Sequence, residues 1–354
     1  MNLGRPFGIK VSVHWTFSLL ILWIVFVSVN LGLEAKQILM HIVFVLTLFV
    51  CVLLHELGHS LAAIRLGGTV QSITLLPIGG MANITEMPEE PKKEFLMSAA
   101  GPIVNIVIAA ALWIYLSVTS VDLSELEYGV ITSDNFIVML MAANIFIVIF
   151  NLIPAFPMDG GRLFRSALST RMSRIKATRI AKDIGQVFAI IFIIAGFFAN
   201  PFLIVIGFFI FLGAKGEYEM MKYRDILNNY TVADIVKTDY EKLDENDTLG
   251  TAADKVLHIS SPGFVITSDG EFKSILTKND LIKGLNSSGK GGKIKDIISN
   301  DIEKVTSDIT LFDAFKKMQM KRYEMMPVIQ NDKFKGVLYL DSINEFFLIK
   351  KAIN

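Results

Sequence analysis

The stretch His55-Glu56-Leu57-Gly58-His59 lies inside a long hydrophobic run and determines how the first part of this chain is interpreted. Histidines four residues apart lie one above the other on a helix, a spacing that suits two ligands of a zinc ion. Glu56 is next to them in sequence and is placed to take a proton from a metal-activated water. Such polar groups inside a transmembrane helix are costly unless they bind a metal, pair or line a wet cavity. The pentapeptide therefore predicts a catalytic zinc site.

A catalytic zinc takes a third protein ligand and leaves one position open for water. The best candidate is Asp159, because it follows a hydrophobic segment that ends among prolines and glycines, Asn151-Leu-Ile-Pro-Ala-Phe-Pro-Met-Asp159-Gly-Gly. His41 is predicted to lie on the same helix as His55, but roughly 20 Å away along its axis. His14 begins an apolar run, where an interfacial position explains it without a metal.

The composition requires a membrane-embedded part. Hydrophobic residues make up 52% of the chain and the mean hydropathy is +0.51, which is too apolar for a wholly soluble protein. Apolar runs suited to crossing about 30 Å of hydrocarbon occupy about residues 12–33, 38–64, 96–118, 136–154, 185–199 and 201–215. The last two are short and are separated by Asn200-Pro201, which predicts a tight hairpin. We expect a polytopic α-helical membrane domain of about six transmembrane helices over residues 1–215.

Positive charges lie in alternate connections of this domain. Lys and Arg precede the first run, follow the second and concentrate over residues 162–182, a stretch expected to be a loop against anionic headgroups, whereas the intervening connections carry only Lys36. The positive-inside rule then predicts a multi-pass protein of the cell membrane with its N-terminus and C-terminal tail in the cytoplasm.

Charge and cysteine content argue against a nucleic-acid partner and against disulfide bonds. The chain has 34 basic and 34 acidic residues and no basic cluster interleaved with aromatics, so we expect no nucleic-acid partner. Cys51 is the single cysteine and lies in an apolar run, so disulfides contribute nothing to the fold.

Residues 228–354 are about twice as rich in charge as the first part, and they repeat themselves at a constant offset of 62 residues. Thr248-Leu249 aligns with Thr310-Leu311, and Phe272-Lys273 aligns with Phe334-Lys335. Each copy is expected to contain a short helix, an amphipathic helix, two strands around a polar turn and a closing helix. We predict a soluble α+β tandem of repeats 228–286 and 290–352, joined to the membrane domain by a linker over 216–227.

Residues 1–215 resemble the site-2 proteases, which are intramembrane zinc metalloproteases. The resemblance rests on His55-Glu56-x-x-His59, Asn151–Gly160, Leu75–Ala82 with its paired glycines, and Ala99–Asn105. It implies Zn²⁺ bound by His55, His59 and Asp159, with Glu56 as the catalytic residue. It also implies hydrolysis of a peptide bond in or near a transmembrane segment of another membrane protein, close to the cytoplasmic face, with substrate contacts at Gly79, Gly80 and Asn151.

Several of these residues also fit a purely structural role. The alternating residues 71–75 before Gly79-Gly80 suit an edge strand that accepts an extended substrate, or only a turn between two strands. Asn151 suits a helix cap as well as a substrate contact. Gly101 and Asn105 are expected to allow close helix packing and one interhelical hydrogen bond.

The C-terminal repeat resembles a tandem pair of cystathionine-β-synthase (CBS) domains. Such pairs commonly bind adenine nucleotides, such as ATP or AMP, and regulate an attached protein, and the resemblance also implies a homodimer. The family's ribose-contacting Thr-x-x-Asp matches Thr277 and Asp280, whereas Tyr339 and Ser342 occupy these positions in the second copy. The alternative for Thr277 and Asp280 is a helix cap.

A second hypothesis belongs to another functional class: a non-proteolytic, nucleotide-regulated membrane metal sensor or transporter that uses the same ligands. It predicts that Glu56→Gln leaves function intact, because a general base would have no task. Transporters often consist of two related halves with broken helices, and residues 1–215 show no such duplication, which favours the protease.

Overall fold

The computed structural model describes residues 2–77, 79–86, 90–119, 130–259, 261–299 and 302–353. The chain divides into two compact units, Met1–Glu219 and Met220–Asn354. Each unit has its own hydrophobic cores.

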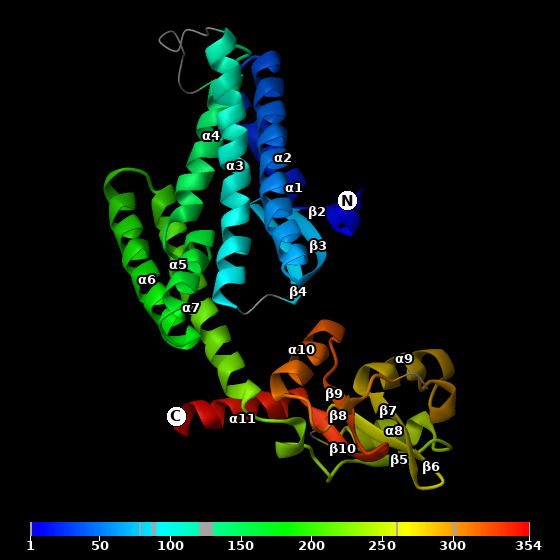
Figure 1. The fold of residues 1–354 in the computed structure, drawn as a ribbon. Coiled ribbons are helices and arrows are strands. Elements are labelled where there is room, and N and C mark those ends of the chain that lie inside the picture. The colour runs from blue at the N-terminus through cyan, green and yellow to red at the C-terminus, as the bar shows by residue number, and fades with distance from the viewer. Residues whose placement is uncertain are drawn as a thin grey trace. The chain divides into compact units, whose positions relative to one another are not determined.

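Apolar helices make up most of the first unit (Figure 1), and they occupy all six predicted spans: α1 (Phe17–Asn30), α2 (Ala35–Arg65), α3 (Pro91–Thr119), α4 (Phe136–Leu152), α6 (Arg174–Phe198) and α7 (Phe202–Asn228). By length and composition α2, α3 and α6 can cross a membrane, and α1 and α4 are shorter apolar helices. Large apolar side chains on these helices, such as Trp113 and Phe197, are exposed. A helix that is apolar all round and exposed is suited to contact with lipid.

A four-stranded sheet in the first unit has the order β1 (Asn2–Gly4), β2 (Lys10–Val13), β3 (Thr69–Leu76) and β4 (Gly79–Glu86). β2 runs parallel to β3, and β4 runs antiparallel to it. The buried side chains of Ile9 and Ile73 pack against Leu57 of α2, so the sheet lies directly on the helix that carries the His-Glu-His sequence.

This sheet corrects two expectations. The first apolar helix begins at Phe17 rather than at residue 12, because Lys10–Val13 forms a strand paired with β3. Residues 71–75 lie in an internal strand, and the edge position next to them belongs to β4, which begins at Gly79.

The basic stretch over 162–182, expected to be a loop, is largely helical. Helix α5 (Asp159–Ser169) occupies its first part, and α6 already begins at Arg174 instead of at residue 185. The buried face of α5 contains Gly160, Gly161, Arg165 and Ser166. Asp159, the predicted third ligand, is the first residue of this helix.

The second unit contains the two predicted copies. The first has a 3-10 turn (Val232–Asp234), β5 (Lys242–Asp244), α8 (Leu249–Val256), β6 (Gly263–Ser268), β7 (Glu271–Thr277) and α9 (Lys278–Ser288). The second has a 3-10 turn (Ile294–Asp296), β8 (Val305–Thr306), α10 (Leu311–Lys321), β9 (Met325–Gln330), β10 (Lys333–Tyr339) and α11 (Leu340–Ile353). In each copy the middle strand pairs in parallel with a short preceding strand and antiparallel with the following one. The short strands β5 and β8 are additions to the predicted elements.

Residues 216–227, expected to be a linker, form the last turns of α7. Ile226 and Leu227 are buried in the core of the second repeat together with Val232 and Leu311. Apolar contacts of this kind hold a segment in place, so residues 220–227 belong to the folded second unit, whereas residues 216–219 belong to the first.

Candidate functional site

Three side chains from two helices converge in the first unit. Nε2 of His55 lies 3.1 Å from Oδ2 of Asp159, and Nε2 of His59 lies 3.0 Å from the same oxygen. The two Nε2 atoms are 3.1 Å apart. The histidines are 5% and 9% exposed, and the side chain of Asp159 is 14% exposed. These three atoms therefore form a compact, largely buried group that could hold a metal ion.

The hydrogen-bond partners of His55 determine which of its nitrogens carries a proton. Its Nδ1 lies 2.6 Å from Oδ1 of Asn105. Nδ2 of Asn105 donates to Asn144, whose own Nδ2 donates to the carbonyl of Leu140. The carbonyl of Leu140 can only accept, so the side-chain nitrogen of Asn144 must face it and the oxygen of Asn144 must face Asn105. The nitrogen of Asn105 then faces Asn144, and its oxygen faces His55. Nδ1 of His55 is therefore the donor, and its Nε2 carries a lone pair in the neutral ring.

His59 is held in the same way. Its Nδ1 donates to the carbonyl of Met97 over 2.8 Å, so its Nε2 also presents a lone pair in the neutral ring. Two nitrogen lone pairs and the carboxylate oxygen of Asp159 then face one another at close range. Such a group of acceptors is satisfied by a cation between them, and two imidazoles with one carboxylate suit a zinc ion that keeps an open position.

The absence of a side chain at Gly101 on α3 makes room for the two imidazoles. A Cβ at this position would lie 2.2 Å from Nε2 of His59 and 2.6 Å from Nε2 of His55. Both distances are far shorter than a non-bonded carbon–nitrogen contact, so any side chain here would displace the imidazoles. Helix α3 thus provides the partners of both histidines, through Asn105 and Met97, as well as the space in front of their rings.

Glu56 lies against the edge strand β4. A Cβ on Gly80 would lie 2.4 Å from Cγ of Glu56, so the backbone of the strand passes directly over this carboxylate side chain. Gly79 is the first residue of the same strand and pairs with Leu76. An edge strand has unpaired backbone groups that can bind an extended peptide, and here that strand adjoins the predicted catalytic residue.

Asn151 lies at the end of α4, where its Nδ2 donates to the carbonyl of Ile147 over 3.0 Å. This bond within its own helix agrees with the helix-end alternative, and it leaves the side-chain oxygen for another partner. His41 bonds to Ser28 and to the backbone N–H of Ile131. Its location confirms that it is separate from the group formed by His55, His59 and Asp159.

The sequence did not reveal the role of Asn105. Its spacing from Gly101 predicts one interhelical hydrogen bond, but not that the partner is a histidine. A buried amide opposite a candidate metal ligand is a signal that becomes visible only when the two helices are placed together. Asn144, the next amide in the chain of hydrogen bonds, has no signal beyond its position in an apolar helix.

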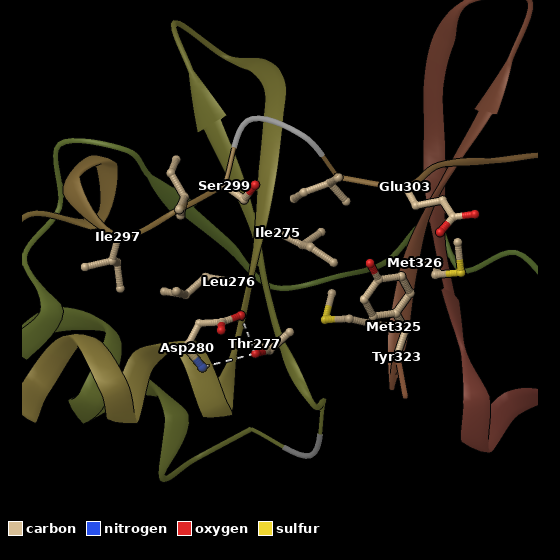
Figure 2. A pocket seen from close by; sticks show the side chains of 12 residues that line it. Ile275, Leu276, Thr277, Asp280, Ile297, Ser299, Glu303, Tyr323, Met325 and Met326 are labelled. Carbon is tan, nitrogen blue, oxygen red and sulfur yellow. Dashed lines mark hydrogen bonds between the residues drawn. The ribbon is translucent and has the colours of Figure 1, made fainter. Parts of the chain in front are cut away.

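A cavity of about 240 Å³ lies between the two C-terminal repeats (Figure 2). Thr277 and Asp280 line one side of it, and Tyr323, Met325 and Met326 line the other. Oγ1 of Thr277 donates to Oδ2 of Asp280 over 2.6 Å and accepts from the Asp280 backbone N–H at 3.2 Å. The predicted helix cap is therefore present, and the same two residues also face the cavity.

Comparison with known proteins agrees with this description. Residues 43–133 and 124–195 match peptidase family M50, and residues 232–287 and 294–348 match the CBS domain. The zinc metalloprotease MJ0392 of Methanocaldococcus jannaschii is 29% identical over 339 residues, which are 96% of this chain and 93% of the relative. The chain belongs to the site-2 protease family.

Two further relatives extend the comparison. Stage IV sporulation protein FB of Bacillus subtilis is 27% identical over 300 residues, covering 80% of this chain and 93% of that protein. The solved site-2 protease from Methanocaldococcus jannaschii is 34% identical and covers 62% of this chain and 94% of its own, with a TM-score of 0.45. With its family established, this site-2 protease is a membrane zinc metalloprotease with a tandem CBS pair, and the metal sensor or transporter hypothesis is disfavoured.

Proposed function

We propose that this site-2 protease binds one zinc ion through His55, His59 and Asp159 and uses Glu56 as its catalytic base. Its reaction would be hydrolysis of a peptide bond in or near a transmembrane segment of a membrane-tethered protein. The observation that carries the proposal is the convergence of three acceptor atoms, with both histidine Nδ1 positions already used as donors.

Zinc bound by these three side chains supplies Lewis-acid activation of a water and of the scissile carbonyl. The carboxylate of Glu56 takes the proton of the attacking water and returns it to the leaving amine. Asn105 and the Met97 carbonyl hold the imidazoles in the required tautomer and orientation. The burial of the histidines limits bulk water around the group, which strengthens electrostatic interactions there.

The edge strand β4 supports a mode of substrate binding. A helical substrate hides its amides in internal hydrogen bonds and must be unwound before one of them can be attacked. Pairing of the unwound segment with β4, at Gly79 and Gly80, would replace those hydrogen bonds. Asn151 is the further candidate for contact with the substrate backbone, through its side-chain oxygen.

The proposed orientation follows the distribution of positive charge. Both termini would lie in the cytoplasm of a multi-pass protein in the cell membrane, and cleavage would occur near the cytoplasmic face. The many basic residues of α5 and of the start of α6 support this orientation. A protease-protection assay on membrane vesicles, with tags on each terminus, tests it directly.

Zinc content tests the ligand assignment without knowledge of the substrate. We expect about one zinc per chain in the detergent-purified protein, retained in Glu56→Gln and strongly reduced in Asp159→Ala. Retention by Glu56→Gln together with loss of cleavage separates the base from the ligands. A folded wild-type protein that binds no added zinc would refute the proposal.

The cavity between the repeats supports a second, regulatory activity: binding of an adenine nucleotide such as ATP or AMP, which gates the protease. Asp280 offers a carboxylate for ribose hydroxyls, and Met325 and Met326 offer an apolar, polarisable surface for a base. Dimerisation through the CBS pair is part of this proposal. Cleavage measured with and without nucleotide tests the gating, and sedimentation of the purified protein tests the dimer.

A further inference from the structure

Arg165 is a buried charged residue on the helix that begins with Asp159. Its side chain is 1% exposed, and all of its guanidinium nitrogens are engaged. Nε donates to Oε1 of Glu94 over 2.9 Å, and Nη2 donates to the same oxygen. Nη1 donates to Oε1 of Glu217 over 2.6 Å. Arg165 therefore connects α5 to α3, through Glu94, and to α7, through Glu217.

Glu94 connects Arg165 to α3, the helix that carries the hydrogen-bond partners of both histidines. Its second oxygen, Oε2, lies 2.9 Å from Nη2 of Arg174 at the start of α6. Glu94 is in the first turn of α3, and Met97, one turn further, accepts the hydrogen bond of His59. We call Glu94, Arg165, Arg174 and Glu217 the Arg165 cluster. It fixes the helix that supplies Asp159 relative to the helix that orients the two histidines.

Arg165 also covers the turn that leads into Asp159. Its Cζ lies 4.9 Å from the centroid of the Phe156 ring, close enough for a cation–π interaction. Phe156 is fully buried and packs against Ala214 of α7. A Cβ on Gly213 would lie 2.6 Å from Cδ of Pro157, so α7 lies in close contact with the turn as well. The approach to Asp159 is thus fixed from both sides.

Buried ion pairs contribute little net stability, because removing the charges from water offsets most of their attraction. Such pairs instead fix geometry, because the hydrogen bonds of a planar guanidinium have defined directions. A guanidinium that bonds two carboxylates therefore restricts how the three helices that carry these groups can be arranged. A cluster of two arginines and two glutamates beside a predicted ligand is therefore better explained by positioning than by stability.

We infer that Arg165, held by Glu94 and Glu217, is a positioning residue that sets the place of Asp159 opposite His55 and His59. This inference rests on the proposed zinc site. It predicts that Glu217 affects metal affinity, although Glu217 is distant in sequence from each predicted ligand. A role in folding alone predicts no such effect.

The test measures zinc affinity by competition with a chelator, together with the melting temperature of the zinc-free and zinc-loaded protein. The variants are Arg165→Lys, which keeps the charge but loses the planar fork, and Glu217→Gln, which is mild because Glu217 is partly exposed. Asp225→Asn is the matched control, because it removes one negative charge from an exposed position on the same helix. Asp159→Ala serves as the reference for loss of a ligand.

We expect Arg165→Lys and Glu217→Gln to weaken zinc binding roughly 10-fold, the scale typical of residues that orient metal ligands. The rise in melting temperature caused by zinc should shrink accordingly, and Asp225→Asn should match the wild type. Wild-type zinc affinity in both folded variants, with weakened binding in Asp159→Ala, would overturn the positioning role and leave the zinc site intact. Absence of zinc binding in the wild type would overturn both.

Discussion

Nδ1 of His55 donates a hydrogen bond to Oδ1 of Asn105 over 2.6 Å, inside the helical unit and out of contact with water. The acceptor is held in place because the amide nitrogen of Asn105 is already used by Asn144. The orientation of a predicted ligand on α2 is thus determined by two amides on α3 and α4. Each of these amides is fully buried, so neither can exchange its partner for water.

Replacement of Asn105 by Leu should therefore weaken zinc binding about 10- to 100-fold, because His55 loses the acceptor that fixes its tautomer. Asn105→Asp retains an acceptor and should bind zinc within a few-fold of the wild type. Ser117→Ala is the control on the same helix, since Ser117 is exposed and donates to the carbonyl of Trp113 in its own helix. Chelator competition measures all three, and a leucine variant with wild-type affinity would show that the hydrogen bond is dispensable.

A single methyl group at Gly101 should abolish zinc binding, or weaken it by roughly 100-fold, because it would occupy the space in front of both imidazoles. Alanine is otherwise favourable in a helix, by about 1 kcal/mol over glycine, so the helix itself should persist. Gly216→Ala on α7 is the control, because a Cβ there lies within 4 Å of no described atom beyond its own stretch of helix. Circular dichroism checks folding, and metal analysis gives the result. Full zinc occupancy in Gly101→Ala would contradict the described geometry.

Gly80→Ala should have the opposite pattern, with zinc retained and cleavage reduced at least 10-fold, because the added carbon displaces Glu56 and not the ligands. The measurement pairs zinc content with cleavage of a membrane-anchored test substrate that the wild type cuts. Loss of zinc in this variant would mean that the disturbance reaches the histidines. Undiminished cleavage would mean that Glu56 tolerates displacement.

The nucleotide pocket can be separated from helix capping by a pair of equivalent variants. Thr310 and Asp313 begin α10 with the same two hydrogen bonds that Thr277 and Asp280 make at α9. Asp313 is not among the residues that line the cavity. Asp280→Ala and Asp313→Ala should therefore have similar stability, while only Asp280→Ala loses AMP or ATP affinity, by roughly 10-fold or more. Isothermal titration decides, and equal affinity in the two variants would assign Asp280 to capping alone.

The predicted ligands illustrate what a sequence can reveal about such a site. The spacing of His55 and His59 is a property of one helix, so periodicity is sufficient to place them together. Asp159 is about a hundred residues away in sequence, and the broken apolar segment before it is the local signal that singles it out. The oriented amides and the Arg165 cluster join helices distant in sequence, and no local pattern reports such pairings.

The sheet shows a second limit. Alternation in residues 71–75 correctly predicts a strand, because side-chain direction has period two. Whether a strand is internal or at an edge depends on its neighbours, and one neighbour here is Lys10–Val13 from the start of the chain. The sequence alone does not separate that segment from the first span, because a short apolar strand and the start of a helix have similar composition.

Helix α7 joins the two units without an interruption from Phe202 to Asn228. Ile210 and Ala214 are buried within the first unit, and Leu227 is buried within the second. Removal of the C-terminal repeats by truncation before residue 228 would therefore uncover an apolar surface. A protease domain produced without its repeats would thus need polar residues in place of Ile226 and Leu227, or an end before them, to remain free of aggregation.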